Sequence, residues 1–219
     1  MSIKKKKFYI TTPIYYASGE PHIGHAFTTI LADVIAKYKK LIGYDVVFLT
    51  GMDEHGQKIA EKAAENNMEP QKWVDFITDK FLDLWKKLDI NNTNFIRTSS
   101  PKHKLAVQKV FSEFLIKKYI YLGQWESLYC VGCEETYTKD EAIKKEDGHL
   151  YCRIGHKLIN KKEPSYFFKM SKFTDWIKKF LLNNKNFLYP KTRVNEMINS
   201  FINQGIEDLS VSRTNFKWG

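Results

Sequence analysis

The feature that most constrains this fold is the order strand, helix, strand within the first fifty residues. Residues 7–12, "KFYITT", are β-branched and aromatic and are closed by Pro13, which predicts a strand. Residues 24–41 predict a helix that ends before Gly43, because apolar residues recur there at helical spacing: Phe27, Ile30, Leu31, Val34, Ile35 and Tyr38. Residues 44–50, "YDVVFLT", form a continuous apolar run that is typical of a strand buried on both faces. This order predicts a parallel sheet.

The predicted alternation of helices and strands continues along the chain, and the sequence pattern changes near residue 121. Apolar periodicity predicts further helices at 56–66, 70–88, 101–119, 171–184 and 192–203. Short strands are predicted at 93–100 and within 206–219. Residues 121–166 combine short alternating segments, charged turns and all three cysteines, so we expect a small inserted β-rich element there. The fold predicted is α/β, with a Rossmann-type parallel sheet and an insertion.

The composition allows a polyanionic partner without requiring one. The net charge is +10, and Lys and Arg displace counterions from phosphates. The excess is carried by 31 lysines against four arginines, which equally indicates a compositional bias of the chain, since paired phosphate recognition favours Arg. No apolar run reaches the roughly 18 residues that span a bilayer. The basic N-terminus lacks the apolar segment of a secretory signal. We therefore expect a cytoplasmic protein with no membrane partner.

Two histidines stand at the predicted start of the first helix, in "EPHIGHAFTT". His22 and His25 are three residues apart, so both imidazoles can face one ligand. The position follows the carboxyl end of a strand, where parallel sheets bind ligands against helix N-termini. Two imidazole donors there could stabilise charge that grows on phosphate oxygens, and Gly24 would allow close approach. The alternative is a pair of polar residues at a helix start, one of them a cap.

The three cysteines lie close together with a histidine. Cys130 and Cys133 are separated by two residues, and Cys152 and His156 by three. Three thiolates and one imidazole are a complete set for a structural tetrahedral zinc ion. An odd, clustered number of cysteines is a poor disulfide framework. Three free cysteines in a degenerate knuckle are the alternative.

These motifs resemble the bacterial methionyl-tRNA synthetases, a family of class I aminoacyl-tRNA synthetases. The resembling segments are "FYITTPIYYASGEPHIGHAFTTILADVIAKY", "VVFLTGMDEHGQKI", "NFIRTSSPKH", "LYCVGCEETYT", "SYFFKMSKF" and "DLSVSRTNFKWG", in that order. Together they cover essentially the whole chain. The resemblance implies activation of L-methionine with ATP and Mg²⁺, followed by transfer of methionine to the 3′ end of tRNA(Met).

The resemblance also implies roles for individual residues. His22, Gly24 and His25 would bind ATP, and the two histidines would be catalytic through electrostatic stabilisation. Asp53 would bind the methionine ammonium group; its alternative is an N-cap of the following helix. Ile14 and Tyr16 would line the thioether side chain, which packs well against aromatic rings. Tyr15 can equally be core, and His55 is a further candidate for which a structural role is as reasonable.

The family pattern implies three parts and leaves the zinc site open, because its members carry none, one or two zinc sites. Residues 1–120 would form the first half of the Rossmann domain that binds nucleotide and amino acid. Residues 121–190 would be the connective insertion with its Cys/His knuckle, near the acceptor end of tRNA. Residues 191–219 would be a helical return towards the sheet. The second half of the sheet and the anticodon-binding domain would be lacking, so we expect no activity from these residues alone.

Residues 169–172, "KMSK", spell most of the second signature of the family. We interpret them as a strand-to-helix junction in which Ser171 caps the next helix, because they follow the aromatic strand "SYFF". Other functions stay open. The chain could be another His-x-Gly-His nucleotidyltransferase, a class I synthetase for a different amino acid, or a non-catalytic zinc-containing RNA-binding module.

Overall fold

The computed structural model describes residues 5–137, 141–214 and 217–219. The chain divides into two compact units. One unit comprises Met1–Gln108 with Phe216–Gly219, and the other comprises Lys109–Asn215. Within the described residues, no helix is both long enough and apolar enough to cross a membrane.

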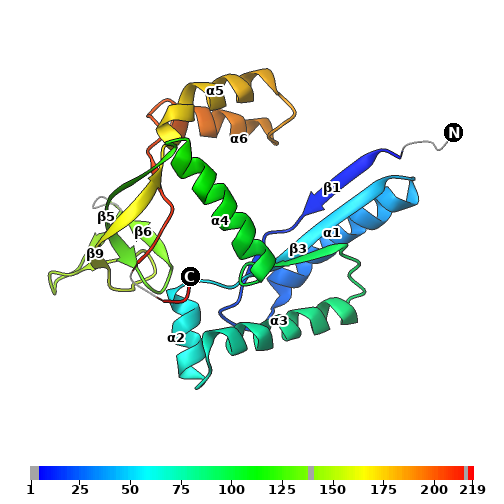
Figure 1. Cartoon of the computed structure of the whole chain (residues 1–219), viewed down its shortest axis with the longest axis horizontal. Helices are drawn as coiled ribbons and strands as arrows, with labels where there is room; N and C mark the ends of the chain where they lie inside the picture. Colours follow the sequence, from blue (N-terminus) through cyan, green and yellow to red (C-terminus); the bar gives the residue numbers. More distant parts are fainter. Residues whose placement is uncertain (1–4, 138–140, 215–216) are drawn as a thin grey trace. The chain divides into compact units, whose positions relative to one another are not determined.

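The first unit is built on a parallel sheet, as the sequence predicts. β1 (Lys7–Thr11) and β4 (Asn94–Arg97) pair with the central strand β3 (Asp45–Asp53), and both pairs are parallel. The two-residue strand β2 (Tyr15–Tyr16) follows β1 and pairs with Met52 and Asp53 at the end of β3. The connection to β3 is the helix α1 (Ile23–Leu41), which runs along β1 and β3 (Figure 1).

Three more helices begin in this unit: α2 (Gln57–Glu65), α3 (Pro70–Lys87) and α4 (Pro101–Ile116), of which α4 continues into the second unit. α3 has Pro at its first position, where the missing N–H costs nothing. Its inward face packs with β2, β3 and α2 to form the main core, which includes Tyr15, Met52, Ile59, Trp73, Ile77, Phe81 and Trp85.

The burial of α1 is the reverse of an ordinary amphipathic helix. The side of α1 that packs on the sheet is made of small or polar residues: Thr29, Ala32, Asp33 and Ala36. The large apolar side chains face outward, with Phe27 64% and Leu31 50% exposed. The other exposed members of this stripe are Ile23, Ile30, Val34, Ile35, Tyr38 and Leu41.

The sheet is also covered less completely than predicted. Val46 and Phe48 are buried against Ala32 and Ala36 of α1. Their neighbour Val47 is 41% exposed, and its partner Tyr9 on β1 is 62% exposed. The prediction that residues 44–50 are buried on both faces is therefore wrong, because Val47 is exposed on the face opposite to that of Val46 and Phe48.

The second unit is mainly antiparallel. Its two long strands, β5 (Ile120–Cys130) and β9 (Ile159–Phe168), pair along almost their whole length (Figure 1). Short strands complete the β structure: β6 (Glu135–Tyr137), β10 (Leu209–Ser210) and the separate pair β7 (Ile143–Lys144) and β8 (Leu150–Tyr151). The helical part comprises the 3₁₀ helix η1 (Met170–Phe173), α5 (Thr174–Asn183), α6 (Lys191–Glu196) and the π-helix η2 (Met197–Ile202).

Candidate functional site

The two histidines form a reciprocal cap at the start of α1. His22 is the N-cap residue, and its Nδ1 accepts a hydrogen bond from the Gly24 N–H at 3.1 Å. The Nδ1 atom of His25 accepts from the N–H of His22, also at 3.1 Å. The two rings are stacked, with centroids 3.8 Å apart. The cap that the sequence left as an alternative is therefore present, and it orients both imidazoles.

This cap decides which nitrogen carries the proton. Because both Nδ1 atoms accept from backbone N–H groups, the neutral rings are protonated at Nε2. An Nε2–H group is a donor suited to an anion, and the N-terminus of α1 adds its own positive field. Burial, helped by the neighbouring His22, holds the pKa of His25 below its ordinary value. At neutral pH His25 is therefore a neutral hydrogen-bond donor.

Gly24 is required by the cap itself. A Cβ atom at this position would lie 2.9 Å from Cε1 of His22 and 3.1 Å from its Nδ1. Any side chain at residue 24 would therefore displace the His22 ring. The ring of His25 also contacts Tyr15, at a centroid distance of 4.9 Å, and Phe81, at 5.1 Å. Tyr15 is buried and is a core residue.

The remaining predicted residues lie at the carboxyl end of β3. Asp53 is the last residue of β3 and is the strand partner of Tyr16, while its carbonyl accepts from the N–H of Ala17 at 3.0 Å. Ile14, just before β2, is 40% exposed. The cap of the next helix, α2, is Gly56. Asp53 is therefore not the N-cap that was considered as its alternative.

His55 is half-buried beside this strand end. Its ring packs on Trp218 at a centroid distance of 5.3 Å. Burial, and then the nearby Lys104, lower the pKa of His55. The sequence did not indicate Trp218, whose indole donates to the carbonyl of Glu54 at 2.5 Å. No sequence signal marks this contact, because the two residues are far apart along the chain.

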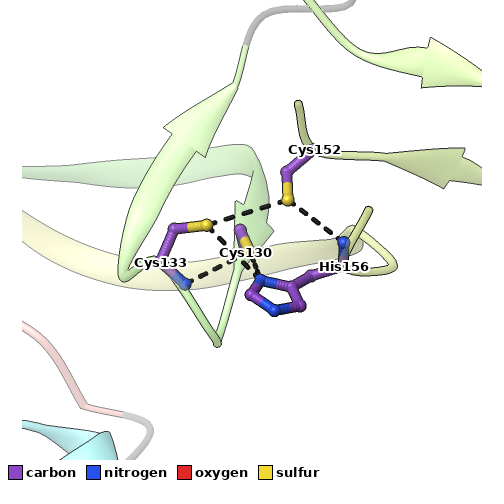
Figure 2. A group of neighbouring side chains, drawn as sticks. All are labelled: Cys130, Cys133, Cys152 and His156. Carbon is purple, nitrogen blue, oxygen red and sulfur yellow. Dashed lines mark hydrogen bonds between the residues drawn. The ribbon is translucent and has the colours of Figure 1, made fainter. Parts of the chain in front are cut away.

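The cysteines and His156 come together in the second unit (Figure 2). One potential ligand atom from each of Cys130, Cys133, Cys152 and His156 lies within 4.8 Å of the others. Sγ of Cys130 accepts from the Cys133 N–H, and Sγ of Cys152 accepts from the His156 N–H. Gly132 makes room for the imidazole, because a Cβ there would lie 2.5 Å from Nδ1 of His156.

Residues 169–172 form the predicted junction, but with a different detail. β9 ends at Phe168 and η1 leads into α5. Ser171 does not cap α5, whose N-cap is Phe173; instead its N–H and hydroxyl donate to Oδ1 of Asp208. The prediction of a Ser171 cap is wrong because Ser171 lies inside η1, and α5 begins only at Thr174, after that turn. Lys172 Nζ lies 4.8 Å from the Tyr119 ring centroid.

The chain matches a known protein family over almost its whole length. A family model described as tRNA synthetases class I (M) matches residues 8–153 and 150–219. The chain belongs to the class I tRNA synthetases. This confirms the family resemblance that the sequence motifs indicate.

Several relatives in sequence carry the name methionine--tRNA ligase. A methionine--tRNA ligase of Ureaplasma parvum is 56% identical over 217 residues, which are 99% of this chain. A methionine--tRNA ligase of Listeria monocytogenes is 49% identical over 225 residues. The chain spans 42% and 34% of the length of these two relatives.

Solved structures agree with the sequence relatives. Mycobacterium tuberculosis methionyl-tRNA synthetase in complex with methionyl-adenylate matches with a TM-score of 0.91 and 36% identity. That match covers 98% of this chain and 42% of the solved chain. A leucyl-tRNA synthetase complex of Agrobacterium radiobacter, at 24% identity and a TM-score of 0.72, shares the fold.

Proposed function

We propose that this chain carries one half of the active site of a methionine--tRNA ligase. The observation that carries the proposal is the stacked His22–His25 cap at the end of a parallel sheet, in a chain that matches a methionyl-adenylate complex. The ligase would form methionyl-adenylate from L-methionine and ATP with Mg²⁺ and then load tRNA(Met). These substrates support a cytoplasmic site of action.

In adenylate formation, the methionine carboxylate oxygen attacks the α-phosphorus of ATP while the bond to pyrophosphate breaks. Negative charge grows on the phosphate oxygens during this step. His22 and His25 supply two Nε2–H donors that the cap has already oriented, so they lose little freedom when ATP binds. Gly24 belongs to this ATP site because it makes the stacked arrangement possible. The histidines act as electrostatic stabilisers and transfer no proton.

The amino-acid subsite would lie at the end of β3. The Asp53 carboxylate would bind the methionine ammonium group in a charge-assisted hydrogen bond. Tyr16 is its strand partner, and Ile14 precedes Tyr16 by two residues, so an aromatic and an apolar side chain can receive the thioether. Asp53 would select for an α-amino acid and the two apolar residues would favour methionine.

The site would be completed by further polypeptide. Parallel sheets are normally covered on both faces. Here Tyr9 and Val47 are exposed, and the apolar stripe of α1 faces outward. The relatives are more than twice as long as the part that this chain matches. We propose that their remaining polypeptide packs on these two surfaces, and that the 219-residue chain is inactive without it.

We keep the three-part division proposed from the sequence. Residues 1–120 would form the first half of the nucleotide- and amino-acid-binding domain, and residues 121–190 the connective insertion. Residues 191–219 would return the chain towards the sheet. The β-rich insertion would serve the acceptor end of the tRNA.

The donor set of the insertion fits a structural zinc ion. Two thiolates on one tetrahedral zinc lie about 3.8 Å apart, given Zn–S distances of about 2.3 Å. The Sγ atoms of Cys133 and Cys152 are 3.7 Å apart. The two backbone N–H groups that donate to Cys130 and Cys152 would stabilise bound thiolates. Cys130, Cys133, Cys152 and His156 would hold the metal, which would stabilise the loops and take no part in the chemistry.

The test is amino-acid-dependent ATP–pyrophosphate exchange by the complete gene product. Methionine should support exchange and leucine or isoleucine should not. Replacing His22 or His25 with Ala should lower the exchange rate by about 10² each, the usual cost of one charge-stabilising donor. Exchange driven by another amino acid, or no exchange at all, would contradict the proposal.

A further inference from the structure

The residue that follows Asp53 is a fully buried carboxylate. Glu54 is 0% exposed, and both of its carboxylate oxygens accept hydrogen bonds. Oε1 accepts from the hydroxyl of Thr78 at 2.8 Å and from Nε of Arg97 at 2.7 Å. Oε2 accepts from the hydroxyl of Ser99 at 2.5 Å and from its N–H at 3.3 Å. Glu54 therefore joins β3 to α3 and to the end of β4.

The backbone of Glu54 is held as firmly as its side chain. Its N–H donates to the hydroxyl of Thr98 at 2.8 Å, and its carbonyl accepts from the indole of Trp218. The carbonyl of Trp218 accepts from the N–H of Gly56 at 3.2 Å. Gly56 is the N-cap residue of α2, and as a glycine it has no side chain that could cap the helix. The loop between Asp53 and α2 is therefore fixed through Glu54 and Trp218.

A buried ion pair is weak evidence of a contribution to stability, because apolar residues of similar volume often serve as well. A buried carboxylate whose two oxygens both accept hydrogen bonds instead fixes the position of its residue, because each hydrogen bond restrains it toward a different partner. Arg97 extends the network, because its second nitrogen donates to Asp75 of α3 at 2.6 Å. Glu54, the residue next to Asp53, is thus held by a network of hydrogen bonds that reaches β4 and α3.

We propose that Glu54 is a positioning residue that holds Asp53 in place for the substrate ammonium group. The inference rests on the proposed function, because it takes Asp53 as the ligand of methionine. β2 restrains Asp53 from one side through Tyr16 and Ala17. Glu54 restrains it from the other side and touches no substrate itself.

Glu54→Gln in the complete gene product tests this role. Gln keeps the volume but turns one acceptor into a donor that faces Arg97 or Ser99, so the loop loses its restraint. The KM for methionine should rise by about tenfold or more, as for one lost charge-assisted contact, while the KM for ATP changes less than about twofold.

Asp33→Asn is the matched control. Asp33 is another buried carboxylate of the first unit, and it accepts from the N–H of Asn91 at 2.8 Å and pairs with Lys37. Its loss should lower the melting temperature without a selective change in either KM. A second readout uses the 219-residue chain: amide hydrogen exchange at Glu54 and Gly56 should be faster in Glu54→Gln, with the rest of the unit unchanged.

Three results would overturn the inference. One is a KM for methionine within twofold of wild type in Glu54→Gln. Another is an equal rise in both KM values together with unaltered amide exchange at Glu54 and Gly56. If the unaltered protein shows no methionine-dependent exchange, the proposed function fails first and this inference fails with it.

Discussion

The cysteine cluster and the proposed active site differ in how far apart their residues lie along the sequence. Cys130, Cys133, Cys152 and His156 come from 27 consecutive residues, and their potential ligand atoms gather within 4.8 Å. The proposed active site takes its histidine cap from the start of α1 and Asp53 from the end of β3, in a unit whose sheet and helix expose large apolar side chains. The first arrangement is complete in itself. The second needs distant residues and, we propose, further polypeptide.

Metal removal should have the largest effect and should stay in the second unit. Structural zinc contributes about 10 kcal/mol or more of apparent binding free energy in small domains. Cys152→Ser should abolish stoichiometric metal and the dispersed NMR signals of residues 130–158, while those of residues 7–97 remain. Metal content and a ¹⁵N spectrum check this. Unchanged spectra in a metal-free protein would show that the cluster needs no ion.

The inverted burial of α1 gives the next largest effect. Ala36 is buried against the sheet, so Ala36→Glu should destabilise the first unit by about 4 kcal/mol, because it buries a charge. Leu31→Glu, on the outward stripe, should change the stability of the 219-residue chain by less than about 0.5 kcal/mol. Urea unfolding of both variants measures the contrast. A large loss in Leu31→Glu would mean that the stripe is already covered in this chain.

The Asp53 carboxylate should matter for binding and little for folding. Asp53→Asn in the complete gene product should weaken methionine binding by about 2 kcal/mol, or roughly 30-fold, through loss of a charge-assisted hydrogen bond. The melting temperature should stay near that of the unaltered protein. Methionine titration and thermal unfolding measure the two quantities. Unaltered methionine affinity would remove Asp53 from the site.

The smallest effect is a pH dependence that comes from His25. Its pKa is lowered in the folded state, mainly by burial and then by His22, so the unfolded chain binds the proton more readily. The stabilising contribution is therefore complete above the ordinary pKa of about 6.5 and is lost as pH falls from there through the lowered folded value. An NMR titration of the His25 ring should give a midpoint below about 6.5, and ATP should raise it. A midpoint above that value would contradict the neutral donor.

The sequence predicts the elements well where the pattern is local. Residues 7–12, 24–41 and 70–88 become β1, α1 and α3 with almost the expected bounds, because periodicity and flanking Pro or Gly residues define them. The grouping of Cys130 to His156 and the meeting of His22 with His25 also follow from short spacings.

The sequence could not show which contacts form across long separations. Nothing in the sequence distinguishes Glu54 from other charged residues. Its hydrogen bonds with Arg97 and Ser99 form only because the fold brings these residues together. For the same reason the sequence does not show that Asp208, 37 residues away, accepts hydrogen bonds from Ser171. The apolar run at 44–50 predicts burial on both faces, and the structure buries one. The difference is what the proposal of further covering polypeptide would explain.

The most direct test of a divided active site is methionine-dependent ATP–pyrophosphate exchange, measured on the 219-residue chain and on the complete gene product side by side. Circular dichroism first establishes that the short chain is folded. We expect exchange by the complete product and none above background by the folded short chain. Exchange by the short chain alone would contradict it, because the histidine cap and Asp53 would then belong to a site that needs no further polypeptide.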